Sequence, residues 1–181
     1  RRDELVTPEL HGVEHEADLG QRDEELVRDV AGVTAGHRRL TERIEAWLGA
    51  EPDPGAPSRL PDWTVGHVLT HLARNADSFV RMIDGAAAGT VLDQYAGGAS
   101  SRSRDIAAGA ERSAAELVAD VVRSAAALDA AFATTDWQGA GRVTSGPAIA
   151  LSELPARRRR EVEVHHVDLG LGYEPEDWPA D

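Results

Sequence analysis

The 181-residue sequence contains no cysteine. This absence excludes disulfide bonds, thiolate metal sites and a cysteine nucleophile, and it makes a secreted disulfide-stapled scaffold untenable. Any thiol chemistry must therefore use a thiol that the protein binds. A chain of this length can bury a substantial core as one domain, so it needs no metal merely to hold together. We therefore expect any bound metal to be functional.

Lysine is also absent, and 19 arginines against 32 acidic residues give a formal net charge of −13. Such a charge opposes sequence-independent binding to nucleic acid or to anionic lipid. No apolar run reaches membrane-spanning length, and the opening segment RRDELVTPEL lacks the apolar stretch of a secretory signal. We therefore expect no nucleic-acid partner, no membrane partner and a cytoplasmic location.

Apolar residues recur at helical spacing in four segments of the chain. The first predicted helix runs from about residue 23 to Gly49, and the second follows a predicted N-cap at Thr64 and ends near Gly85. The third covers 111–135, and the fourth follows Ser152, its predicted N-cap, with Pro155 in the first turn. Four helices of this length predict a bundle, a fold that builds metal sites from side chains on facing helices.

The segments between the predicted helices complete the fold prediction. Residues 86–105 are rich in glycine and serine and predict a long crossover loop. A little extended structure is expected around 137–147, but no strand pattern has convincing length. The fold class is therefore all-α, an antiparallel four-helix bundle with a long crossover loop over residues 22–181. Residues 1–21 are predicted to be a polar N-terminal extension, in which His11 and His15 are expected to be solvated.

Two pairs of ligand-type side chains lie on separate predicted helices. His67 and His71 form one pair, and Glu161 and His165 form the other. Residues four apart share one face of a helix, so each pair can chelate a metal. One pair alone would favour histidines packed at a helix interface. Two pairs in a cysteine-free bundle leave a metal site and interface packing equally open.

Two motifs carry a more specific resemblance. They are D-W-T-V-G-H-V-L-T-H-L-A-R-N-A at 62–76 and R-E-V-E-V-H-H-V-D-L-G at 160–170. Together they resemble the DinB-like, mycothiol-dependent maleylpyruvate isomerase family, from about Glu24 to the last residue. The family has a further C-terminal domain, and the sequence ends about where that domain would begin. We therefore expect that domain to be absent or truncated.

The resemblance implies a ligand set and a cofactor. It implies that His71, Glu161 and His165 hold zinc or another divalent metal and that mycothiol is the thiol cofactor. Two imidazoles and one carboxylate are typical of catalytic zinc sites, which keep one position open for water or substrate. His67 is expected beside the ligands or merely packed, and His166 is expected to point away from them.

Three further residues are assigned to the site. The segment S-R-S-R-D-I resembles the family segment that supplies an active-site arginine, and its alignment selects Arg102 over Arg104. In the run of four arginines at 157–160, Arg158 alone, one turn before Glu161, can face the site. Asn75 occupies a polar, pocket-facing position that the family motif shares. Asp168 can orient a ligand imidazole or pair with an arginine.

The implied function is a cis–trans isomerisation of a small electrophile such as maleylpyruvate. A thiolate adds to the conjugated double bond, rotation follows about the resulting single bond, and the thiol is expelled. Arg102, with Arg158, would bind the substrate's carboxylates through forked hydrogen bonds. Three alternatives stay open: a mycothiol S-transferase in detoxification or biosynthesis, a metal-dependent hydrolase, and a non-catalytic metal-binding module. The oligomeric state is left open.

Overall fold

The computed structural model describes residues 10–144 and 146–180, with side chains from Gly20 onward. The helices are α1 (Leu10–Leu48), α2 (Val65–Ala87), α3 (Gly98–Ala110), α4 (Ala114–Thr134) and α5 (Leu154–Asp168). Strands β1 (Ala140–Arg142) and β2 (Ala148–Ala150) form a short antiparallel hairpin between α4 and α5. Short 3-10 turns occupy Leu151–Glu153 and Pro175–Asp177. Within these residues, no helix combines the length and apolar character that crossing a bilayer requires.

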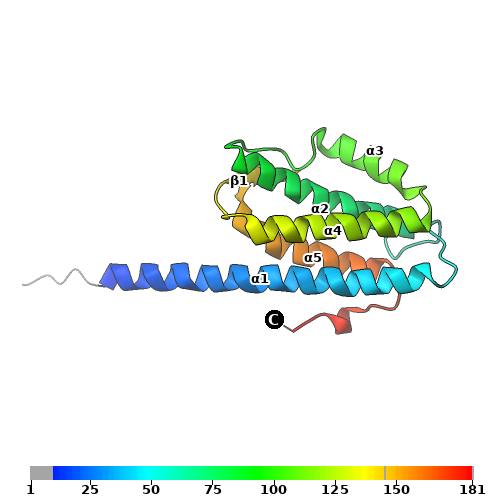
Figure 1. The fold of residues 1–181 in the computed structure, drawn as a ribbon, viewed down its shortest axis with the longest axis horizontal. Helices are drawn as coiled ribbons and strands as arrows, with labels where there is room; N and C mark the ends of the chain where they lie inside the picture. The colour runs from blue at the N-terminus through cyan, green and yellow to red at the C-terminus, as the bar shows by residue number, and fades with distance from the viewer. Residues whose placement is uncertain (1–9, 145, 181) are drawn as a thin grey trace, which may run out of the picture.

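The four long helices lie side by side as a bundle, with α3 packed on α2 (Figure 1). Helix α1 is antiparallel to α2, and α4 is antiparallel to α5. Helices α2 and α4 run in the same direction because α3 carries the chain back along the bundle (Figure 1). The predicted all-α bundle is confirmed, with the small hairpin added to it.

The predicted crossover loop at 86–105 is wrong in its second part, where the chain forms α3. Ile106 and Ala110, one turn apart, are buried, and α3 approaches α2 closely at two glycines. A Cβ atom at Gly66 would collide with the Ala110 carbonyl oxygen, and one at Gly109 would collide with the side chain of Thr70. Packing against α2 therefore supplies the helix stability that the weak helix formers of this segment lack.

Other helix ends also differ from expectation. Helix α1 begins at Leu10 instead of near residue 23, and the side chains of His11 and His15 lie outside the described residues. Ser152 lies in a 3-10 turn and does not cap α5, whose first turn holds Pro155 as predicted. The Thr64 hydroxyl accepts a hydrogen bond from the backbone N–H of His67 and caps α2, which confirms that prediction.

Two apolar clusters fill the bundle, and a buried polar layer separates them. One cluster includes Leu40, Leu72 and Val162, and the other includes Val33, Phe79 and Leu154. Between them along the four helices lie the polar residues His37, Asn75, Ser124 and Arg158, each at most 3% exposed. This layer interrupts the core close to the predicted site.

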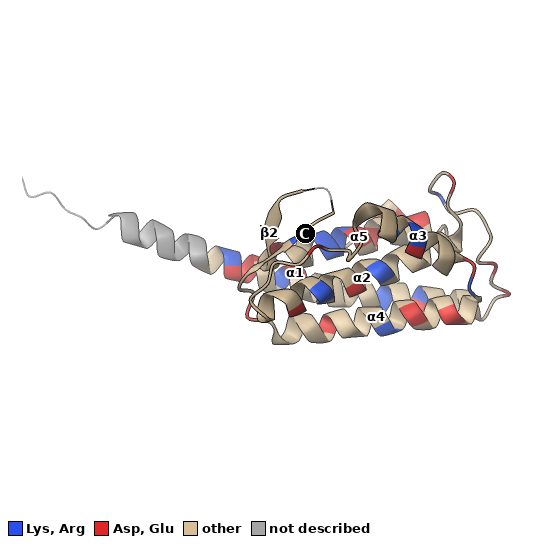
Figure 2. Ribbon diagram, turned by 90° about the horizontal axis from the view of Figure 1, so that it is seen from above, with Lys and Arg blue, Asp and Glu red and all other residues tan. Residues whose placement is uncertain are grey.

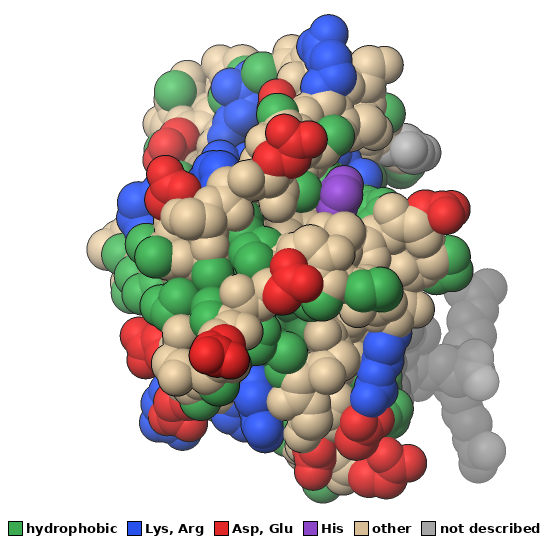
Figure 3. All heavy atoms as spheres, turned by 90° about the vertical axis from the view of Figure 1, so that its right-hand side faces the viewer, with side chains coloured by type: hydrophobic (Ala, Val, Ile, Leu, Met, Phe, Trp, Pro, Cys, Tyr) green, Lys and Arg blue, Asp and Glu red, His purple; other side chains and the backbone are tan. Residues whose placement is uncertain are grey.

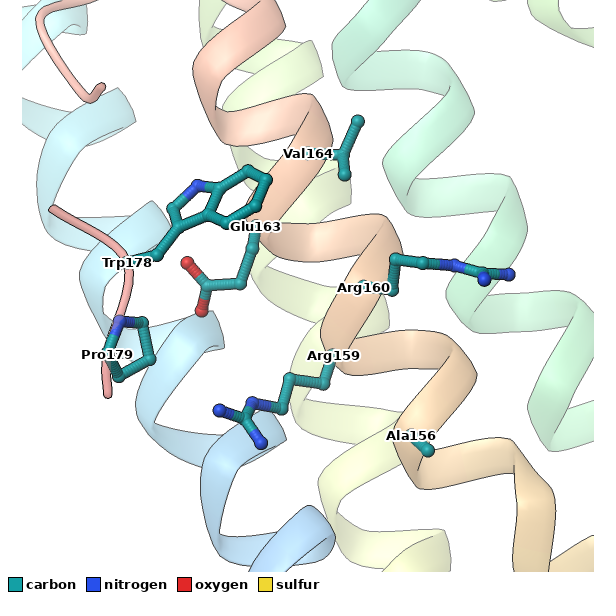
Figure 4. A pocket seen from close by; sticks show the side chains of 7 residues that line it. All are labelled: Ala156, Arg159, Arg160, Glu163, Val164, Trp178 and Pro179. Atoms are coloured by element: carbon teal, nitrogen blue, oxygen red, sulfur yellow. The ribbon is translucent and has the colours of Figure 1, made fainter. Parts of the chain in front are cut away.

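Acidic residues and arginines are interspersed along the bundle helices (Figure 2). Asp120 of α4 forms ion pairs with three arginines, Arg74, Arg112 and Arg123. In the arginine run, Arg157 pairs with Glu153, whereas Arg158 is buried. Arg159 and Arg160 line a hollow of about 270 Å³ between α5 and the C-terminal segment, beside Trp178 (Figure 4). The predicted ligand residues do not line this hollow.

Candidate metal centre

His71 of α2 meets Glu161 and His165 of α5 at the seam between these two helices. His71 Nε2 lies 3.0 Å from Glu161 Oε2 and 3.0 Å from His165 Nε2, and the last two atoms are 3.5 Å apart. Tetrahedral ligands at typical zinc distances stand about 3.3–3.6 Å from one another. The three atoms are thus spaced to hold one small divalent cation. In the described part of the chain, no other group of three or more His, Cys, Asp or Glu side chains converges in this way.

The start of α2 sets the register of His71. His67 Nδ1 accepts a hydrogen bond from the Thr64 backbone N–H at 3.3 Å and lies 2.8 Å from the Thr64 hydroxyl oxygen. This reciprocal arrangement is a capping box, with histidine in the position that glutamate or glutamine usually takes. His67 is therefore used at the helix end, and His71 follows one turn later on the seam.

Neighbouring side chains fix the orientation of both imidazoles. Asp168 Oδ2 lies 2.8 Å from His165 Nδ1, which leaves His165 Nε2 facing the cluster. A carboxylate on the far nitrogen is the usual support of a metal-binding histidine. On the other side, the Trp63 ring meets the His71 ring edge-on at a centroid distance of 5.7 Å. Asp168 therefore orients the His165 imidazole, one of the two roles that the sequence analysis left open for it. The sequence analysis assigned no role in the site to Trp63, although this residue lies inside the first motif.

The protonation states of the cluster follow from burial and from the internal hydrogen bonds. Burial is the main influence that lowers the pKa of His71, so this imidazole is neutral at neutral pH. Burial also acts to raise the pKa of Glu161, but hydrogen bonds from His165 and His71 outweigh it and lower the pKa overall. For His165, burial lowers the pKa, whereas Glu161 and Asp168 together raise it above the ordinary value.

One side of the cluster remains reachable from solvent. The His71 side chain is 4% exposed, whereas those of His165 and Glu161 are 16% and 30% exposed. Histidine atoms reach the surface at this end of the bundle (Figure 3). A cation held by the three side chains would therefore keep an open position for a ligand.

Arg102 of α3 reaches the cluster, which agrees with the selection of Arg102 instead of Arg104 as the site arginine. Its Nη2 atom lies 3.1 Å from His71 Nδ1, and its guanidinium carbon lies 5.9 Å from the centre of the Tyr95 ring. Arg104 is exposed. Helix α3, which the sequence analysis did not predict, thus brings Arg102 to the site.

Arg158 and Asn75 lie in the buried polar layer, one turn away from the cluster. Arg158 Nη1 donates to Asn75 Oδ1 at 2.7 Å and to the Leu72 carbonyl oxygen at 3.0 Å, and its Nε donates to His37 Nε2 at 3.0 Å. Asn75 therefore holds Arg158 and does not contact the three ligand atoms. His166 points away, as expected, and stacks on Tyr173 with 3.9 Å between the ring centroids.

Comparison with known proteins identifies the family. Residues 16–170 match the profile of the mycothiol maleylpyruvate isomerase N-terminal domain. The chain belongs to this family. A solved structure of the mycothiol-dependent maleylpyruvate isomerase is 26% identical, with a TM-score of 0.77. A histidine-to-alanine variant of that isomerase gives the same values. The alignment covers 85% of this chain and 64% of the solved chain, so this chain spans less than two thirds of that isomerase. No curated protein matches the chain.

The family match covers the elements that form the site. The solved isomerase shares the helical fold, which agrees with the bundle described above. The match extends to Gly170 and so includes α2 and α5, the two helices that carry the cluster, and α3, which carries Arg102. The domain that the family profile describes therefore contains all six residues that the sequence assigned to the site.

Proposed function

We propose that this domain binds a divalent metal and mycothiol and acts on a small electrophilic substrate, as an isomerase or a thiol transferase. A maleylpyruvate-type cis–trans isomerisation is the favoured reaction. The observation that carries the proposal is the convergence of His71 Nε2, Glu161 Oε2 and His165 Nε2 with one side open to solvent. Two imidazoles and one carboxylate with an open position form a ligand set of the catalytic zinc type.

The donor chemistry fits such a metal and a borrowed thiol. The three residues would hold the cation, and zinc is favoured over nickel or iron. The cation would favour the deprotonated form of a thiol at the open position. Because the chain contains no cysteine, this thiol must come from a small molecule, for which mycothiol is the family's cofactor.

Arg102 is the proposed substrate-binding residue. Its guanidinium donates to His71 Nδ1, and such a bond requires that this nitrogen carries no proton. A neutral imidazole that binds a metal through Nε2 carries its proton on Nδ1 and cannot accept there. Metal binding would therefore release Arg102, whose planar fork suits a carboxylate of the substrate. Alanine at this position should lower thiol-dependent turnover without changing the metal content.

Metal content of a matched pair of variants tests the ligand set. His71→Gln removes a proposed ligand, whereas His67→Gln keeps a side chain that completes the capping box. We expect about one metal ion per chain in the wild type and in His67→Gln, and a loss of stoichiometric metal in His71→Gln. Full occupancy in His71→Gln together with loss in His67→Gln would show that the ligand assignment is wrong.

Calorimetry with mycothiol tests the thiol step. Mycothiol should bind metal-loaded protein more tightly than metal-free protein and release protons, because a free thiol is largely protonated at neutral pH. Buffers of different ionisation enthalpy measure those protons, and glutathione serves as a control thiol. Binding that does not depend on the metal would refute the proposal and favour a non-catalytic module.

Turnover assays separate the remaining reactions. An isomerase should convert a cis substrate with mycothiol in catalytic amounts, whereas an S-transferase should consume the thiol in proportion to the product. A metal-dependent hydrolase should act without added thiol, which would contradict both proposed activities.

A further inference from the structure

A polar stripe continues beyond the cluster along the seam between α2 and α5. On α2, His71, Asn75 and Ser78 lie at helical spacing on one face. On α5, which runs in the opposite direction (Figure 1), Arg158 lies one turn before Glu161. The Arg158–Asn75 pair is therefore the next level of the seam, about 5 Å deeper than the cluster.

Arg158 is an incompletely satisfied charge at this level. Its side chain is fully buried, and its three hydrogen bonds within the described structure go to the neutral groups of His37, Leu72 and Asn75. The remaining Nη2 atom is buried and has no hydrogen-bond partner among the described residues. A buried guanidinium costs several kcal/mol unless an opposite charge and further hydrogen bonds compensate it. Nη2 is thus a donor without an acceptor.

A second buried polar atom without a partner belongs to Tyr95, whose hydroxyl oxygen makes no hydrogen bond within the described structure. Its neighbour Gln94 fixes this segment against α2 and β1. The Gln94 side-chain nitrogen donates to Ser78 Oγ at 3.2 Å, and its backbone N–H donates to the Arg142 carbonyl oxygen at 2.8 Å. Ser78 in turn donates to the Asn75 carbonyl oxygen at 2.6 Å. Tyr95 therefore follows a firmly held residue beside the Asn75 turn of α2.

The charge of Arg158 depends on burial and on the groups around it. Burial lowers the pKa of Arg158 to about 10, so the guanidinium stays charged at neutral pH. Glu161 has the largest opposing influence, and Tyr95 comes next, ahead of Asp129. A divalent cation on Glu161 would offset that carboxylate and leave Arg158 with less compensation. An anion beside Arg158 would then restore the lost compensation.

We propose that Tyr95 is a further substrate-binding residue, whose hydroxyl and the Arg158 Nη2 group together donate to one carboxylate of the substrate. Arg102 lies over the Tyr95 ring while it donates to His71, and so connects Tyr95 with the cluster. Release of Arg102 would free the space beside the Tyr95 ring for the substrate. The ligand class is a small carboxylate. The inference rests on the metal site of the proposed function, because metal binding releases Arg102, but it does not depend on the thiol reaction.

The two tyrosines of the chain provide a matched pair of variants. Tyr95→Phe removes a hydroxyl that has no partner, whereas Tyr173→Phe removes one that donates to Glu163, away from the cluster. Maleate serves as the probe, added to metal-loaded protein without thiol, and its dimethyl ester serves as the uncharged control. In Tyr173→Phe, a ¹³C label on tyrosine reports on Tyr95 alone.

We expect maleate, but not the ester, to shift the Tyr95 resonance in Tyr173→Phe. Tyr95→Phe should weaken maleate binding about tenfold or more, which is the loss expected for one hydrogen bond to a charged group. The same variant should keep its melting temperature, metal content and mycothiol affinity, whereas Tyr173→Phe should melt earlier and bind maleate normally. This opposite pattern distinguishes a binding role for Tyr95 from a structural one.

Equal maleate affinity in Tyr95→Phe and wild type would overturn the inference, and so would an unchanged Tyr95 resonance at saturating maleate. If mycothiol still binds in a metal-dependent manner, that result leaves the proposed function standing. Conversely, maleate binding that depends on Tyr95, without any mycothiol binding, would support the carboxylate position and refute the thiol reaction. The two proposals therefore fail separately.

Discussion

Removal of the Asp168 side chain should weaken metal binding without removing a ligand. Asp168 Oδ2 lies 2.8 Å from His165 Nδ1, and both side chains are about 15% exposed, so solvent screens the bond only weakly. Loss of such a supporting carboxylate typically costs 10–100-fold in metal affinity, or about 1.4–2.7 kcal/mol. Asp168→Ala should show this loss. Asp168→Asn should lose less, because its amide oxygen can still accept from Nδ1.

Competition against a chromophoric chelator measures this effect. The backbone carbonyl of Asp168 accepts a hydrogen bond from Arg59 N–H, and neither substitution removes it, so the fold at the end of α5 should persist. Glu153→Gln is a matched control, since that carboxylate pairs with Arg157 at the other end of α5. If Asp168→Ala bound metal within twofold of wild type, the orienting role of the carboxylate would be refuted.

Three further predictions concern stability. Asp120→Asn should lower the free energy of unfolding by about 2 kcal/mol in urea titrations, because a buried carboxylate with three partly exposed arginine partners is lost. Burial raises the Asp120 pKa, but hydrogen bonds from Arg123 and Arg112 lower it overall. Its contribution is therefore present above about pH 4 and is lost as the pH falls through the lowered pKa of the folded state. A stability difference between wild type and variant that does not shrink as the pH falls below about 4 would contradict this. Thr64→Ala should cost about 1 kcal/mol by loss of the cap, with Thr64→Ser close to wild type. Chelation should lower the melting temperature while helical circular dichroism at 25 °C persists, since the bundle has an apolar core of its own.

The bundle helices could be predicted because their cores are periodic in sequence. Apolar residues at helical spacing define the buried faces of α2 and α4, and Thr64 marks a helix start by its own side-chain chemistry. The shared face of Glu161 and His165 was also predictable, because residues four apart on a helix share a face. The choice of His71 over His67 as their partner came from the family resemblance and not from spacing. These features depend on the local geometry of a helix, which can be inferred from a single sequence.

Helix α3 and the partners of the site could not be predicted in this way. The segment of α3 contains glycine and serine, which have weak helix propensity, and it becomes helical by close packing on Gly66 of α2. Trp63 and Tyr95 gain their positions from contacts with His71 and Arg102, and Arg158 from contacts that span up to 121 residues. The glycine- and serine-rich segment 86–105 indicated a crossover loop, but no local pattern indicated which residues this segment would bring together.

The buried polar layer is hard to explain by stability alone. A bundle with apolar residues at these positions would avoid the desolvation of a guanidinium, a change that is often neutral or stabilising. Here, further residues hold the guanidinium in one orientation: Asp129 Oδ1 lies 2.9 Å from His37 Nδ1, which fixes the tautomer that accepts from Arg158 Nε. Burial is the main influence that lowers the His37 pKa, so this histidine remains a neutral acceptor. The guanidinium is thus held one helical turn below three converging ligand atoms with one donor unused, an arrangement that supports the proposed carboxylate position more readily than a role in stability.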